Sequence, residues 1–153
     1  MQTDEFLGAA FPDVEPVTRT LWITEELRGP VEELLGHRFN VLRVRYWQDG
    51  DKTAWILDEV GKEKPITIGV LVESNAVDRV RVLEFREIRG WEVRYPFFTD
   101  QFNGARFVNG AERRGQALDR QIDGITGATL SVGAVTRIVE VALFLSEQVG
   151  GST

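Results

Sequence analysis

The sequence predicts an α+β domain, in which an antiparallel β-meander packs against a long C-terminal helix and a shorter N-terminal helix. The first observation behind this prediction is the β-rich composition of residues 41–85, where apolar and charged residues alternate between short turn-forming clusters. The second is the helical spacing of apolar residues over 131–148. The chain has 153 residues and shows no repeat or long linker, so we expect a single domain over residues 1–153.

Two short helices are expected ahead of the meander. Residues 4–10 form the first, and Pro12 ends it. Thr24 is expected to cap the second helix, and Gly36 to end it. Pro30 is expected to kink this second helix or to delay its start. Its apolar side chains recur on one face, at Leu27, Val31, Leu34 and Leu35.

Four strands are expected in the meander, over residues 41–47, 53–57, 66–73 and 77–85. The Asp49-Gly50 pair favours a hairpin turn between the first two strands. In the last strand the apolar positions change parity between Val82 and Leu83, which predicts a β-bulge. Three tryptophans at strand-like positions are expected in the core: Trp22, Trp47 and Trp55.

Residues 90–120 are expected to be irregular, because aromatic residues alternate there with glycine and proline. Long irregular segments are usually functional or mobile. Arg113 and Arg114 within this segment are expected to be solvated. The chain then closes with the helix over about 131–148, whose apolar stripe must pack on the sheet.

Composition excludes several kinds of function. Lys and Arg number 18 against 24 Asp and Glu, so the net charge of −6 disfavours nucleic acid as a partner. The absence of cysteine excludes thiolate metal sites, iron–sulfur clusters and a cysteine nucleophile. The single histidine, His37, excludes sites that need two imidazoles, and we expect it at the surface or a helix end without a nearby partner. No membrane span and no export signal are expected in this sequence.

The segment that carries chemistry is DGITGATLS, Asp123 to Ser131, directly ahead of the last helix. Small residues that lead into a helix N-terminus offer unpaired backbone N–H groups and the positive end of the helix dipole, which suits a phosphate. The hydroxyls of Thr126, Thr129 and Ser131 can bind such a ligand or be modified by it. The physics alone favours the alternative interpretation, an ordinary capped helix start preceded by a turn.

The same nine residues resemble the flavin attachment motif, D-x-x-(S/T)-G-A-T, of FMN-binding domains such as those in the NqrC and RnfG subunits of membrane redox pumps. In that family a flavin transferase of the ApbE type joins the last Thr of the motif to the phosphate of FMN. The resemblance implies covalent FMN at Thr129. The implied binding set in the motif is Asp123, Gly124, Thr126, Gly127, Ala128, Thr129, Leu130 and Ser131.

The resemblance extends over roughly residues 4–149, including the segment FREIRGWEVRYPFF, and points to a smaller, stand-alone branch. Two features of the pump subunits are missing: the E-T-P-G-L-G-type segment, in whose place residues 90–96 stand, and the N-terminal membrane helix. Their pump partners therefore do not carry over, whereas covalent FMN does.

A tether at the phosphate leaves the isoalloxazine ring to be held by separate contacts. The aromatic segment supplies the candidates Trp91, Tyr95 and Phe97, each of which is equally well explained as a core or rim aromatic. Positive charge near the ring favours its reduced form, and the candidates are Arg94, Lys62 and Lys64, each also explained as a solvated surface charge.

The leading hypothesis is an extracytosolic electron-transfer flavoprotein, in the periplasm or on the outer face of the cytoplasmic membrane. Its expected partners are the transferase and membrane or periplasmic redox proteins. One alternative is a flavin-dependent reductase or dehydrogenase, although no GxGxxG segment and no acid–base pair are visible. Another is a flavin-free module that docks on a membrane redox protein. Whether the chain is an enzyme with its own substrate stays open.

Overall fold

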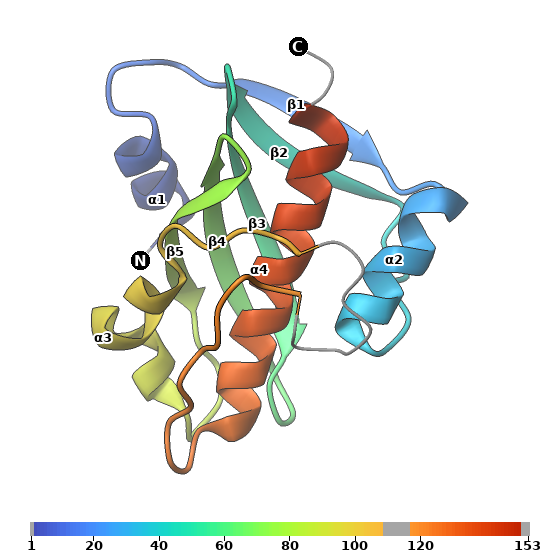
Figure 1. The fold of residues 1–153 in the computed structure, drawn as a ribbon. Coiled ribbons are helices and arrows are strands. Elements are labelled where there is room, and N and C mark those ends of the chain that lie inside the picture. The colour runs from blue at the N-terminus through green and yellow to red at the C-terminus, as the bar shows by residue number, and fades with distance from the viewer. Residues whose placement is uncertain (1, 109–116, 151–153) are drawn as a thin grey trace.

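The structure, a computed structural model, describes residues 2–108 and 117–150. Five antiparallel strands form one sheet in the order β1-β2-β3-β4-β5, and helices pack against it (Figure 1), which confirms the predicted α+β class. The elements in chain order are α1 (Thr3–Ala10), β1 (Val17–Trp22), α2 (Glu25–Leu35), β2 (Arg43–Asp49), β3 (Lys52–Val60), β4 (Pro65–Glu73), β5 (Ala76–Glu84), η1 (Trp91–Arg94), α3 (Pro96–Thr99), η2 (Asp100–Phe102) and α4 (Thr129–Gly150). Arg113 and Arg114, expected to be solvated, lie outside the described residues.

The predicted four-stranded meander is confirmed as β2 to β5, each strand pairing with the next. The predicted β-bulge is also confirmed: Thr67 pairs with Glu84 and Ile68 with Val82, so Leu83 is the extra residue. Val82 faces the main core and Leu83 faces α1, as ordinary alternation along a strand gives. Because of the extra residue, Phe85 packs on the main core again, which is the predicted change of parity.

The edge strand β1 was not among the predicted strands. Its residues, which pair with β2 from Val17↔Gln48 to Trp22↔Arg43, are almost all exposed, so no alternation of buried and exposed positions marks it in the sequence. The prediction that Trp22 lies in the core is wrong, because its side chain is exposed beside Arg43. Trp55 is fully buried as predicted, and Trp47 is partly buried under α1.

Both short helices are found, with α2 running from Glu25 through Pro30 without a delayed start. Thr24 occupies the N-cap position in an extended conformation, but its side chain makes no capping hydrogen bond. The helix ends at Gly36 as predicted. Across 90–102 the structure has three short helical segments where the sequence indicated irregular chain.

The long helix α4 lies across the sheet and supplies much of the main core (Figure 1). Its length and mean hydropathy would suffice for a membrane span, yet 67% of that stretch is buried inside the fold, as in a core helix. A buried polar contact fixes it to β3, because the Trp55 indole N–H donates to Thr53 Oγ1, which lies 3.0 Å from Ser146 Oγ.

A second polar link joins the segment after α2 to β3 and α4, and it corrects the prediction that His37 has no partner. His37 Nε2 lies 2.9 Å from the buried Glu59 carboxylate, which also accepts a 2.9 Å hydrogen bond from Arg137 Nε. The contacts with the Arg38 carbonyl and Glu59 raise the pKa of His37 above its ordinary value. The partner lies 22 residues away, so it comes from strand placement and not from local sequence.

Candidate functional site

The predicted motif forms a tight turn that delivers the chain into α4. The Ala128 amide donates to the Ile125 carbonyl at 2.9 Å, and Gly127 adopts a positive φ of 81° that other residues rarely accept. α4 begins at Thr129, and the amide of Val132 bonds back to Ala128. In this helical geometry the amides of residues 129–131 have no partner within α4, as the sequence predicts for a site that suits a phosphate.

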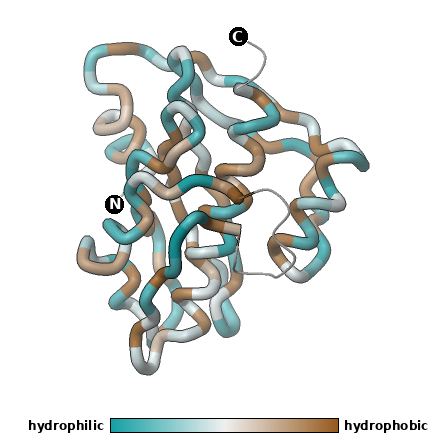
Figure 2. The backbone as a smooth tube through the Cα atoms, in the orientation of Figure 1, coloured by the Kyte–Doolittle hydropathy of each residue, from teal (hydrophilic) through white to brown (hydrophobic). Residues whose placement is uncertain are grey.

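Gln101 anchors the start of the motif, and sequence reasoning did not identify it. Its side-chain oxygen accepts from the Asp123 amide at 2.8 Å, and its side-chain nitrogen donates to the Asp123 carbonyl at 3.3 Å. This two-way bond holds the motif backbone to η2 and leaves the Asp123 side chain exposed. Figure 2 shows the turn directly before α4 as mostly pale, so it is neither strongly hydrophilic nor strongly hydrophobic.

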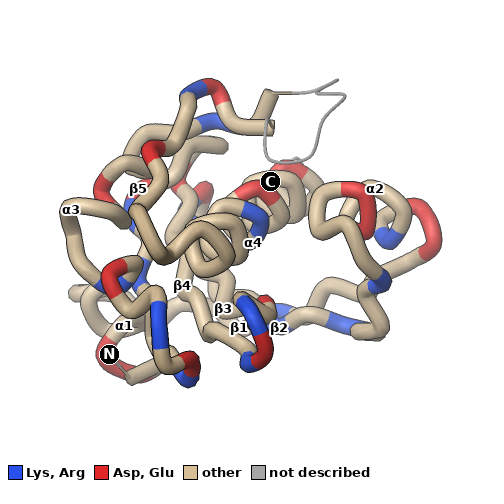
Figure 3. Tube along the Cα trace, turned by 90° about the horizontal axis from the view of Figure 1, so that it is seen from below, with Lys and Arg blue, Asp and Glu red and all other residues tan. Residues whose placement is uncertain are grey.

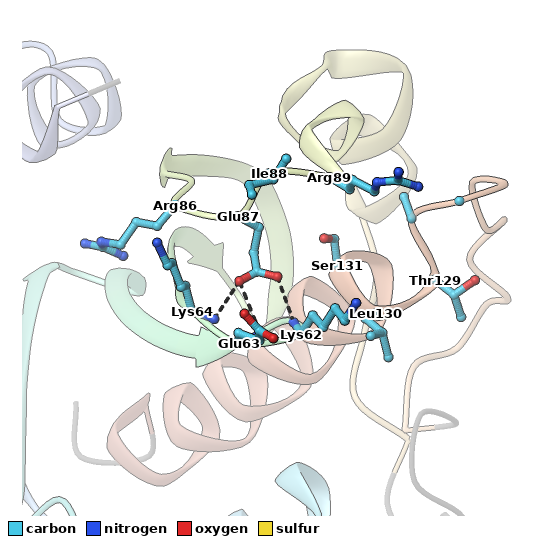
Figure 4. A pocket seen from close by; sticks show the side chains of 13 residues that line it. Lys62, Glu63, Lys64, Arg86, Glu87, Ile88, Arg89, Thr129, Leu130 and Ser131 are labelled. Atoms are coloured by element: carbon cyan, nitrogen blue, oxygen red, sulfur yellow. Dashed lines mark hydrogen bonds between the residues drawn. The ribbon is translucent and has the colours of Figure 1, made fainter.

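The three motif hydroxyls differ in accessibility and position. Thr129 is exposed and lines a cavity of about 500 Å³. Thr126 is exposed but does not line this cavity, and Ser131 lines it but is buried. Figure 4 shows the Thr129 side chain at the edge of the cavity, on the opposite side of the helix start from Ser131. Only Thr129 combines an accessible hydroxyl with contact to the cavity.

Three chain segments wall this cavity, which we call the motif cavity: residues 62–64 in the β3–β4 turn, residues 86–90 after β5, and residues 127–131. Figure 1 places the β3–β4 turn and the start of α4 at the same end of the molecule. The structure thus brings the predicted residues Lys62 and Lys64 to the site together with Gly127 to Ser131. Leu130, also in the predicted set, lines the cavity and is 54% exposed.

Glu87, a residue that sequence reasoning did not single out, joins two of these walls. Its carboxylate accepts hydrogen bonds from the amides of Lys62, Glu63 and Lys64 at 3.2, 3.2 and 2.6 Å (Figure 4). Desolvation raises its pKa, but these three amides and the Lys64 charge outweigh it, so the pKa lies below its ordinary value. A charged Glu87 therefore fixes the turn that carries the two lysines.

The aromatic residues predicted to hold a flavin ring form a separate cluster on η1 and α3. The rings of Trp91 and Tyr95 meet edge to face at 5.4 Å, and Phe97 lies 6.3 Å from Tyr95. All three are exposed, as is Arg94, and none of them lines the motif cavity. The cluster adjoins the cavity through Gly90, which precedes Trp91. A ring contact with Trp91, Tyr95 or Arg94 stays a prediction.

A second cavity, of about 770 Å³, lies on the other side of Thr129. Its walls are residues 118–122 and one stripe of α4 that includes Val132, Thr136 and Arg137. Among the motif residues only Thr129 lines it, whereas five consecutive motif residues line the motif cavity. Thr129 therefore lies between the two cavities and lines both of them. Sequence spacing alone does not reveal this placement.

Fold and site together define an α+β domain in which a helix start with free backbone amides lies beside a cavity rimmed by cations. Comparison with known families agrees with this description, because the chain matches the FMN-binding domain family over residues 61–143. The match covers more than half of the 153 residues and includes all three walls of the motif cavity, and the chain belongs to this family. No curated protein matches the chain.

Proposed function

We propose that the chain is an extracytosolic electron-transfer domain, with FMN joined through its phosphate to the hydroxyl of Thr129. The observation that carries this proposal is the position of Thr129, which is exposed, begins α4 and lines the motif cavity. A transferase must reach the hydroxyl that it modifies, and the attached group must then find space nearby. Thr126 and Ser131 each meet only one of these two conditions.

The proposed modification is a phosphoryl transfer to the Thr129 oxygen. That oxygen forms a bond to the phosphorus of the FMN part of a flavin anhydride such as flavin adenine dinucleotide. The anhydride bond breaks, AMP leaves with the electron pair, and the hydroxyl proton passes to a base on a transferase of the ApbE type. No oxidant or reductant is needed.

The residues around Thr129 fit a phosphate ester. The amides of residues 129–131 have no partner within α4, and the helix dipole adds positive potential at the same point. Bound FMN supplies reversible electron transfer. The chain's own contribution is to hold the phosphate at the helix start and to present Lys62 and Lys64 at the opposite wall of the cavity. Positive charge there favours the negative charge that reduction adds.

The proposed location is the periplasm or the outer face of the cytoplasmic membrane, with membrane or periplasmic redox proteins as electron donor and acceptor. Support comes from the resemblance to extracytosolic relatives and from the absence of cysteine, which suits an oxidising compartment. Fractionation of cells that express the native gene tests this part, and recovery of the protein with the cytosol would contradict it.

Covalent attachment is tested by producing the chain with and without an ApbE-type transferase and measuring its intact mass. We expect a mass increase equal to FMN minus water only in the presence of the transferase, with flavin fluorescence retained in a denaturing gel. Thr129→Ala should abolish both signals, whereas Thr126→Ala should only reduce them, because Thr126 does not line the cavity.

Peptide mapping identifies the modified residue. Modification of the Thr129→Ala chain at another hydroxyl would show that the assignment is wrong. Steady-state turnover with NADH as reductant separates a carrier from an enzyme, since rapid turnover without a protein partner would favour a reductase.

A further inference from the structure

The mouth of the motif cavity carries a net charge opposite in sign to that of the whole chain. Four cationic side chains line it, those of Lys62, Lys64, Arg86 and Arg89. Two anionic side chains accompany them, Glu63 and Glu87, which gives a local net charge of +2 in a chain of net charge −6. An esterified phosphate at Thr129 would add one negative charge and leave the mouth positive.

Three of these cations are available to a partner. Lys62, Lys64 and Arg89 are exposed, and none of the ion pairs among the described residues involves them. Arg86, by contrast, pairs with Glu84 at 2.6 Å. The anionic Glu87 is held by three backbone amides, so its charge is directed into the turn.

Exposed apolar side chains lie among these charges. Ile88 is 93% exposed between Glu87 and Arg89, and Leu130 is 54% exposed on the opposite wall. Figure 4 shows Ile88 pointing away from the helix start. Apolar residues encircled by charges are typical of the interfaces of transient protein complexes.

Acidic residues gather elsewhere on the molecule. α2 carries Glu25, Glu26, Glu32 and Glu33 against one basic residue, Arg28, and Figure 3 shows its red segments away from the β3–β4 turn. A charge distribution of this kind orients the molecule as it approaches an anionic surface.

We propose that residues 62–64, 86–90 and Leu130, here called the basic face, form the docking surface for a redox protein with an acidic face. This inference rests on the proposed function, because docking at this mouth brings a partner directly against the cavity that would hold the flavin. Charge complementarity selects the partner: the net charge of −6 repels an acidic protein as a whole, whereas the local net charge of +2 at the basic face attracts one.

The test is an NMR titration of the full isotope-labelled chain, with and without covalent FMN, against zinc-substituted rubredoxin as a small acidic probe. We expect amide shift changes concentrated in the basic face, and weaker binding as salt is raised from about 0.02 to 0.3 M. A basic c-type cytochrome is the opposite probe and should perturb α2 instead. The proposal would be overturned if rubredoxin changed the amide shifts of α2, or changed no amide shifts at all. Binding of the cytochrome at the basic face would also overturn it.

Two charge-reversal variants with equal net charge isolate the local effect. Lys64→Glu/Arg89→Glu should weaken rubredoxin binding at low salt by about tenfold or more. The control Arg19→Glu/Arg38→Glu changes exposed arginines outside the basic face and should bind as the unmodified chain does. Equal weakening in both variants would mean that net charge governs binding, which overturns the proposal.

The titration without FMN separates this proposal from the proposed function. Binding at the basic face by a chain that acquires no FMN even when it is produced with the transferase would support the docking surface and contradict the flavin assignment. Attachment of FMN at Thr129 without rubredoxin binding would support the flavin assignment and contradict the docking surface.

Discussion

A Cβ atom placed on Gly90 would lie 2.2 Å from Ser131 Oγ and 2.9 Å from Ser131 Cβ. Gly90 also has a φ of +90°, which residues with a side chain rarely adopt. The segment after β5 therefore passes directly against the first turn of α4, and this contact closes one side of the motif cavity. Glycine at position 90 is required for both the backbone conformation and the close approach.

Gly90→Ala should destabilise the fold by about 2–4 kcal/mol, because about 1–2 kcal/mol of left-handed strain adds to the cost of overpacking. Denaturant unfolding measures this loss. Ser131→Ala in the same background should restore only part of it, because it removes Oγ but keeps Cβ at 2.9 Å. Gly124→Ala is the matched control, since no atom lies within 4 Å of its added methyl group. Equal losses at positions 90 and 124 would refute the close contact.

The sequence predicted local features well. The strands of the meander, the bulge at Leu83 and the turn before α4 each depend on a pattern within one element, and each is found. The position of Thr129 at the helix start followed from the same kind of local signal.

Features that depend on how distant segments meet were not predictable in this way. Glu87 reaches the 62–64 turn only because β4 and β5 pair in register. His37 reaches Glu59 only because α2 packs beside α4, which in turn packs on β3. The exposure of Trp22 reflects the edge position of β1, which the residue type does not reveal. For the same reason, the walls of the motif cavity could not be assembled from the sequence.

Glu140 should make the fold less stable as pH rises. It is fully buried on α4, and one carboxylate oxygen accepts from the Ala117 amide at 2.9 Å while the other has no hydrogen-bond partner among the described residues. Desolvation raises its pKa from 4.5 to about 7. A raised pKa stabilises the fold below about pH 4.5, and this stability, on the order of 3 kcal/mol, is lost as pH rises to about 7.

Glu140→Gln resembles the protonated acid, so the variant should match the unmodified chain near pH 5 and exceed its stability at pH 8. The free energy of unfolding across this range measures the effect. A smaller slope should remain in the variant, because the pKa of His37 is also raised and its contribution is lost at higher pH. An unchanged slope between pH 5 and 7 in Glu140→Gln would show that Glu140 is not the titrating group.

Once FMN is attached at Thr129, its isoalloxazine ring must be held by contacts separate from the phosphate. Trp91→Ala should leave attachment intact but expose the ring further, because an aromatic contact contributes about 0.5–1.5 kcal/mol beyond burial. We expect iodide to quench the flavin fluorescence more strongly in this variant, and the fluorescence anisotropy to fall.

Removing positive charge near the ring should lower the midpoint potential of the flavin. We expect a larger effect for Lys64→Gln than for Arg94→Gln, since of these two residues only Lys64 lines the motif cavity. Arg120→Gln, in the cavity on the other side of Thr129, is the control and should leave the potential unchanged. A shift in Arg120→Gln with none in Lys64→Gln would place the ring in that second cavity instead.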